Sequence, residues 1–114
     1  MPHVESYAFG KITVDGQTYT KDLLLLPAGP HPNWWRKEGH LLQPTDLQDV
    51  LEAKPTILIV GCGNPGLMKV PQGTLDWLAT QEVRVEVLPT ATACQRYNEL
   101  APSERAAAAL HLTC

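Results

Sequence analysis

The chain has 114 residues, a formal net charge of −3 and 18% charged residues, a composition typical of one globular domain. The absence of a Lys/Arg cluster argues against a nucleic-acid-binding protein. The longest apolar run, Leu23–Leu26, is too short for a transmembrane helix, and the first residues resemble neither a signal peptide nor a transit segment. Three cysteines without a C-x-x-C pair indicate reduced thiols and a cytoplasmic location.

The first third of the chain predicts two strands and a long loop. Apolar and polar residues alternate over Tyr7–Val14, and the Asp15-Gly16 dipeptide that follows favours a type I′ hairpin turn. Gln17–Leu26 is therefore expected to be the returning strand. Pro27–Leu42 is rich in Pro and Gly and is expected to be a loop, either functional or packed against the domain.

The rest of the chain predicts alternating helices and strands. In chain order we expect a helix between Pro44 and Pro55, a central strand at Thr56–Val60, a helix from Pro71, a strand at Val83–Leu88, and a helix from Pro89-Thr90 to Pro102. The segment from Thr56 to Leu88 should form a parallel strand-helix-strand unit. For Arg105–Cys114 the run of four alanines favours a helix by propensity.

The stretch Gly61-Cys62-Gly63-Asn64-Pro65-Gly66 has the spacing G-x-G-x-x-G of a dinucleotide-binding loop. However, four residues separate Gly66 from the proline that opens the next helix, so no helix N-terminus directly follows the glycines. Pro65 also lacks the N–H that a phosphate would need. The motif is therefore interpreted as a tight turn with positive φ angles, and no cofactor is expected.

Several short motifs, taken together, resemble a small family of domains of unknown function. They are Trp34-Trp35-Arg36 with Gly39-His40, Asp46-Leu47, Gly61-x-Gly63, Thr90, Ala93-Cys94, Tyr97-Asn98-x-Leu100, Glu104-Arg105 and the ending His111-Leu112-Thr113-Cys114. Relatives in that family include an adipogenesis-associated protein and a mitochondrial assembly factor for respiratory complex I.

The resemblance implies a mixed α/β (α+β) fold made by a single domain over residues 1–114. It implies three layers, β+α/β/α, around a central mixed sheet, with an N-terminal β-hairpin, three helices and an antiparallel C-terminal strand. On this point it disagrees with helix propensity at the C-terminus, and we follow the resemblance. It implies no established reaction, cofactor or catalytic residue.

One candidate site is a crevice beyond the carboxyl ends of the parallel strands, where ligands bind in open α/β sheets. The residues expected there are Gly61, Gly63, Gly66, Lys69, Thr90, Thr92, Tyr97 and Asn98. Free N–H groups at the start of the last helix and the charge of Lys69 would suit a carboxylate or another anion. The alternative is structural: Thr90 or Thr92 caps the helix, and Asn98 binds nearby backbone.

A second candidate site is the loop that contains Trp34, Trp35, Arg36 and His40, because Trp and Arg are the residue types that anchor protein interfaces. The alternative is a loop packed down by its own tryptophans. For His40 a structural hydrogen bond is expected rather than proton transfer. No metal site is expected, because the four histidines are scattered along the sequence.

These features favour a non-enzymatic protein-interaction or assembly module with a protein partner. The alternative is a protein that binds a small anion or metabolite, or a minor enzyme, using the crevice at Gly61–Gly66 and Thr90–Ala93. The sequence does not fix whether the chain forms a homo-oligomer.

Overall fold

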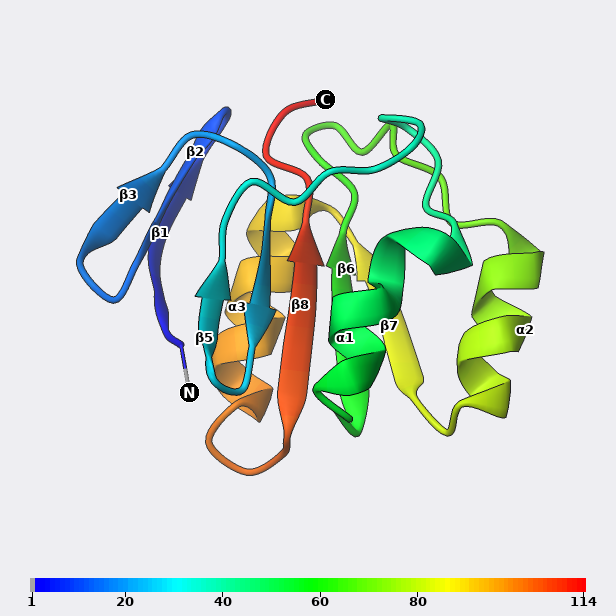
Figure 1. Ribbon diagram of the computed structural model, residues 1–114. Helices are drawn as coiled ribbons and strands as arrows, with labels where there is room; N and C mark the ends of the chain where they lie inside the picture. Colours follow the sequence, from blue (N-terminus) through cyan, green and yellow to red (C-terminus); the bar gives the residue numbers. More distant parts are fainter. Residues whose placement is uncertain (1) are drawn as a thin grey trace.

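Two β-sheets and three α-helices make up the computed structural model, which describes residues 2–114 (Figure 1). The strands are β1 (Val4–Ala8), β2 (Lys11–Val14), β3 (Gln17–Tyr19), β4 (Leu23–Leu26), β5 (Gly29–His31), β6 (Ile57–Gly61), β7 (Arg84–Leu88) and β8 (Ala106–Leu110). The helices are the 3-10 helix η1 (Pro44–Leu47), which continues into α1 (Gln48–Glu52), then α2 (Gln72–Thr80) and α3 (Thr90–Leu100). None of the helices in the described part of the chain is long and apolar enough to cross a bilayer.

The N-terminal sheet is antiparallel and has the order β1-β2-β3. Asp15 and Gly16 have φ angles of 49° and 82°, which confirms the predicted turn between β2 and β3. The expectation of one returning strand over Gln17–Leu26 is wrong. The chain leaves the first sheet after Tyr19 and enters the second sheet at Leu23, because the four leucines that follow need a neighbour on both faces.

The second sheet has the order β5-β4-β8-β6-β7, so the C-terminal strand β8 lies at its centre. The strand β8 is antiparallel to β4 and parallel to β6, and β6 is parallel to β7 as expected. The helix that propensity favours at the C-terminus is therefore wrong, and the strand implied by the resemblance is correct. Burial decides the outcome: all five residues of β8 are buried.

The second sheet is covered on both faces, which gives the expected three layers. One face packs against α3 and the small sheet; its buried side chains include Leu23, Leu25, Ile57, Ile59, Ala106, Ala108, Ala93, Cys94, Tyr97, Ile12 and Val14. The other face packs against η1, α1, α2 and the tryptophan loop; its buried side chains include Leu24, Leu58, Val60, Ala107, Ala109, Trp34, Leu42, Leu47, Val50, Met68 and Leu78. The loops at the carboxyl ends of β6 and β8 lie at the same end of the molecule as the C-terminus (Figure 1).

Candidate functional site

The glycine turn after β6 meets the start of α3, as the crevice hypothesis requires. The Thr90 N–H donates to the Gly63 carbonyl at 3.2 Å. The Thr90 hydroxyl accepts the Gly63 N–H at 2.8 Å and donates to the His111 carbonyl at 2.6 Å. A Cβ at Gly61 would lie 3.2 Å from the Thr90 Cα, so glycine allows the helix to approach the strand closely. One buried hydroxyl thus joins β6, α3 and the residue after β8.

Neither threonine caps α3, so that expectation is wrong. The N-cap residue is Pro89, and no side chain makes a capping hydrogen bond there. The Thr90 hydroxyl is turned to the Gly63 turn instead, and Thr92 is exposed further along the helix. In this position the Thr90 hydroxyl makes two buried hydrogen bonds, whereas a capping side chain would make its bond to the N–H groups of the first helical turn.

The space directly over Gly63 is filled by the C-terminal residues. The Asn64 N–H donates to the Thr113 carbonyl at 3.0 Å, and the Leu67 N–H donates to the Cys114 carbonyl at 2.9 Å. An ideal Cβ on Gly63 would lie 2.2 Å from the Thr113 oxygen. The tail therefore packs against the bare peptide of the turn, and no ligand-sized space remains between Gly63 and Thr90.

The other residues expected in the crevice do not converge there. Tyr97 is fully buried in the core beneath α3, and burial raises the pKa of its phenol. Asn98 clamps the first strand, since its side chain accepts the Val4 N–H at 2.9 Å and donates to the Val4 carbonyl at 2.7 Å. Gly66 and Lys69 line a neighbouring hollow of about 360 Å³, with Cys62, Pro65, Met68, Val70, Leu75, Val87, Leu88 and Pro89.

Near the C-terminal tail, three side chains from distant parts of the sequence form a buried charged cluster. Arg36 Nη1 lies 2.9 Å from Asp22 Oδ2, and His111 Nδ1 lies 2.8 Å from the same oxygen. Asp22 Oδ1 accepts the Leu112 N–H at 2.8 Å. The Arg36 guanidinium also donates twice to the Gly39 carbonyl and stacks over the Trp34 ring at 4.6 Å. This cluster joins the start of β4, the tryptophan loop and the C-terminal tail.

The charge of Asp22 is stabilised in this cluster. Burial by itself would raise the pKa of the carboxyl, but hydrogen bonds from His111 and the Leu112 N–H, with the charge of Arg36, hold the pKa below its ordinary value. Asp22 is therefore an anion at neutral pH and offsets the buried positive charge of Arg36.

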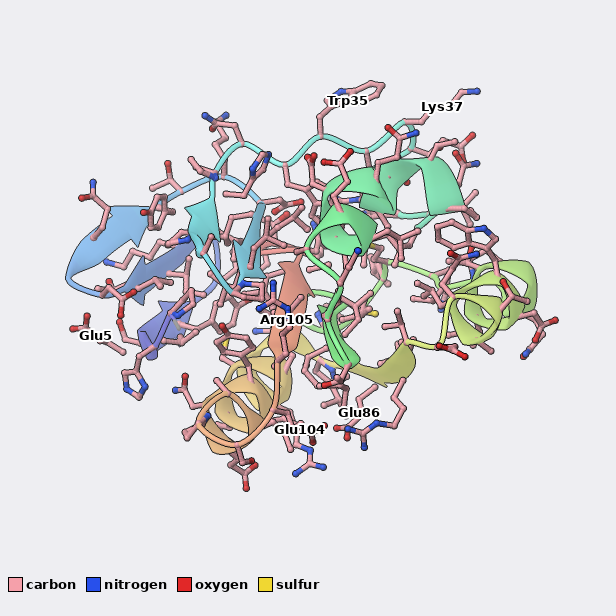
Figure 2. All side chains as sticks on the ribbon, turned by 60° about the horizontal axis from the view of Figure 1, so that its bottom comes forward. Glu5, Trp35, Lys37, Glu86, Glu104 and Arg105 are labelled. Carbon is pink, nitrogen blue, oxygen red and sulfur yellow. The ribbon has the colours of Figure 1, made fainter. Side chains whose placement is uncertain are left out.

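The tryptophan loop is split between the interior and the surface. Trp34 is buried, and its Nε1 donates to the Asp46 carbonyl at 2.9 Å. Trp35, next in sequence, is 76% exposed and points away from the body of the protein (Figure 2). Of the four expected interface residues, Trp34 and Arg36 thus anchor the loop, while Trp35 and His40 are exposed.

Three of the large exposed apolar side chains of residues 2–114 belong to segments bonded to or lying beside the C-terminal tail. Phe9 precedes Gly10, whose N–H donates to the Leu112 carbonyl at 2.9 Å. The Leu67 N–H donates to the Cys114 carbonyl, and Trp35 lines a hollow together with Thr113. We call Phe9, Trp35, Leu67, Thr113 and Cys114 the tail surface.

Sequence reasoning missed two of the residues that organise this end of the molecule, Asp22 and His111. His111 entered only as part of the ending that resembles the family, and Asp22 carried no motif. An acidic residue directly before the four leucines of β4 was the available signal, because a charge in that position needs a partner once it is covered. Burial raises the pKa of the Cys94 thiol to about 12, and it also raises the pKa of the Cys62 thiol, which lines the hollow near Lys69.

Comparison with known proteins identifies relatives of this fold. The model of a family described as "Protein of unknown function (DUF498/DUF598)" matches residues 4–111. A solved protein designated MT938 is 30% identical, with full coverage of both chains and a TM-score of 0.81. The conserved hypothetical protein PH1505 from Pyrococcus horikoshii is 24% identical over 97% of this chain and 98% of that chain, with a TM-score of 0.83. A Mth938-like domain from Bordetella pertussis is 20% identical over 97% of this chain and 85% of that chain, with a TM-score of 0.65.

Proposed function

This chain belongs to the DUF498/DUF598 family of proteins of unknown function, and from that premise we propose that it is a non-enzymatic protein-interaction or assembly module. Its contact site is the tail surface, and its partner is a folded protein with an apolar pocket for the Trp35 indole. The similarity noted above to an assembly factor of respiratory complex I is in keeping with a module of this kind. The observation that carries the proposal is the 76% exposure of Trp35 in a loop that is otherwise tightly anchored.

The loop around Trp35 is held in place from both sides, which supports a role in binding. Trp34 is fixed by its hydrogen bond to Asp46, and Arg36 by its ion pair with Asp22. The backbone is also fixed, because the Trp34 N–H donates to the Asp22 carbonyl at 2.9 Å. An indole presented on a rigid segment loses little conformational freedom on binding, and tryptophan is among the residue types most enriched in binding hot spots.

Two further exposed apolar side chains lie on other segments that are bonded to the C-terminal tail. Phe9 and Leu67 are 58% and 46% exposed, and both belong to segments bonded to the C-terminal tail. Exposed aromatic and aliphatic side chains gathered at one end of a small domain are typical of protein-interaction sites. The Asp22–Arg36–His111 cluster ties the tryptophan loop to the C-terminal tail, and the segments of Phe9 and Leu67 are bonded to that tail.

Trp35→Ala is expected to leave the stability of the isolated protein within about 0.5 kcal/mol of wild type, because the side chain is exposed. It should weaken partner binding by about 30-fold or more, the size of a hot-spot loss. The measurement is quantitative copurification from the native cells, followed by titration of the purified partner against both forms.

Val87→Ala is the matched control, since Val87 is also an exposed apolar residue (42%) but lies on β7, where it lines the hollow beside Lys69 and is not part of the tail surface. Recovery of the partner should fall with Trp35→Ala and stay unchanged with Val87→Ala. Equal recovery of every copurifying protein with the two variants would exclude Trp35 as the contact residue.

A second candidate function is the binding of a small anionic molecule, and the hollow of about 360 Å³ favours it. The hollow lies between the carboxyl ends of β6 and β7. After β6 the chain continues into α2 on one face of the sheet, and after β7 it continues into α3 on the other face. This is the place where open α/β sheets bind ligands. Its lining is mainly apolar, with the cation Lys69 at its edge, so a short-chain carboxylic acid has the matching chemistry.

Titration of the protein with butyrate or hexanoate, followed by amide chemical shifts, tests this candidate. Binding should move the resonances of Gly66, Lys69 and Leu88, which line the hollow, and should weaken about tenfold in Lys69→Met, which removes the cation. Lys37→Met, at an exposed position on the tryptophan loop, is the control and should bind as wild type does. Resonances that do not move at Gly66 and Lys69 would rule out the hollow as the site.

A further inference from the structure

His111 carries a polar atom that the fold buries without a partner. The side chain is more than nine-tenths buried, and its Nε2 makes no hydrogen bond to the described residues. The other ring nitrogen, Nδ1, contacts both Asp22 and Arg36, at 2.8 Å and 3.1 Å. We place the proton on Nδ1, because the closer of its two neighbours is the Asp22 carboxylate, an anion that accepts a hydrogen bond. The Nε2 atom is then left with a free lone pair.

A second imidazole, that of His40, lies beside this ring. The His111 Cδ2 atom is 2.9 Å from the position that a Gly63 side chain would take, so the Cδ2–Nε2 edge is turned toward the glycine turn and away from Asp22. The His40 ring lies 5.5 Å from the His111 ring, centroid to centroid, at an angle of 74°. The backbone of His40 is held there, because its carbonyl accepts the Lys69 N–H at 2.8 Å.

We propose that His40 and His111 bind one divalent transition-metal ion, with Zn²⁺ as the representative case, and that water completes its coordination. Imidazole nitrogen is a preferred ligand of Zn²⁺, Cu²⁺ and Ni²⁺. Two imidazoles on one tetrahedral Zn²⁺, with Zn–N bonds of about 2.0–2.1 Å, have ring centroids about 5–6 Å apart, and the observed separation fits this range. The site goes beyond the proposed protein-interaction function and does not depend on it.

Asp22 supplies the outer support that metal-binding histidines usually have. A ligating histidine normally donates its second ring N–H to a carboxylate, which fixes the ring and raises its basicity. Asp22 also offsets the charge of Arg36 through a contact of 2.9 Å. The nearby cation would otherwise oppose metal binding.

The described residues supply two ligands to this site. Within residues 2–114, no group of three or more His, Cys, Asp and Glu side chains is arranged to bind an ion. The ion would therefore keep open positions for water, as catalytic zinc sites do, and would bind more weakly than in a closed structural site. Because His40 is exposed and His111 is buried, the open positions would lie on the His40 side of the ion.

Calorimetric titration of the metal-free protein with Zn²⁺ tests the proposal, together with the ring ¹⁵N shifts of the histidines. One ion should bind per chain, and the shift of His111 Nε2 should change on binding. His40→Asn removes an exposed ligand without disturbing the core, and it should weaken the affinity at least about tenfold. The double variant His3→Asn/His31→Asn removes the two histidines outside the site and should bind as wild type does.

Any one of the following results would overturn the proposal. They are the absence of saturable Zn²⁺ binding up to millimolar concentration, an affinity unchanged by His40→Asn, and a loss of binding in His3→Asn/His31→Asn. An unchanged His111 Nε2 shift in the zinc-saturated protein would also overturn it, because the ion would then be held elsewhere. His31 is the most important control, since it lies 3.4 Å from Asp49 and could bind an ion by itself.

Discussion

Gly63→Ala should destabilise the protein by about 3–5 kcal/mol, because two unfavourable effects act at one position. The φ angle of Gly63 is +101°, which an alanine adopts only with strain. The new Cβ would also lie 2.2 Å from the Thr113 carbonyl oxygen, so the C-terminal tail would have to move. The measurement is the free energy of unfolding from denaturant titration.

Gly66→Ala is the matched control in the same turn. Its φ angle is +118°, but the nearest atom to its Cβ position is 4.0 Å away, so only the backbone strain remains. We expect a loss of about 1–2 kcal/mol for this variant. Equal losses for the two variants would show that the tail does not pack on Gly63 in solution.

Arg36→Met should destabilise the protein by about 3–5 kcal/mol, because it leaves the partly buried Asp22 carboxylate without its cationic partner. It also removes the donors to the Gly39 carbonyl and the stacking on Trp34. Arg84→Met is the control. Arg84 pairs with Glu104, but its side chain is 64% exposed, so about 1 kcal/mol or less is expected.

The pH dependence of stability checks the same cluster. The pKa of Asp22 in the folded protein is below the ordinary value of 3.8, so its contribution to stability is present above about pH 4 and is lost as the pH falls through the folded value. Asp22→Asn should flatten the loss of stability in this acid range. Combined with Arg36→Met, it should cost less than the sum of the two single changes, because no unpaired charge remains. Additive losses would contradict the coupling seen in the structure.

Local sequence signals predicted much of the fold because the interactions behind them lie close together in the chain. The Asp15-Gly16 turn needs only two residues that tolerate positive φ. The apolar run before Gly61 forms a strand, and the apolar residues spaced three and four apart after Pro44 and Pro89 form helices. The buried and exposed faces of α3 follow from the same spacing.

The candidate site was less accessible to sequence reasoning, because its geometry depends on the C-terminus. The glycine turn and the start of α3 were placed correctly at the ends of β6 and β7, but nothing local indicated that Thr113 would cover Gly63. Likewise, Trp34 and Trp35 are adjacent and chemically identical, yet one is buried and the other is exposed. Only the packing of the loop against Asp22 and Asp46 distinguishes them.

The sequence by itself determined the turns, the three helices and the strands β6 and β7, since each rests on contacts within a few residues. Only the tertiary structure decided that an alanine run with high helix propensity becomes the central strand, because burial between two strands outweighs that local preference. It also decided the Asp22–Arg36–His111 cluster, in which His111 is 75 and 89 residues from its partners. A buried charge is stabilised by whichever groups the fold brings within hydrogen-bonding distance, and separation in sequence carries no information about that distance.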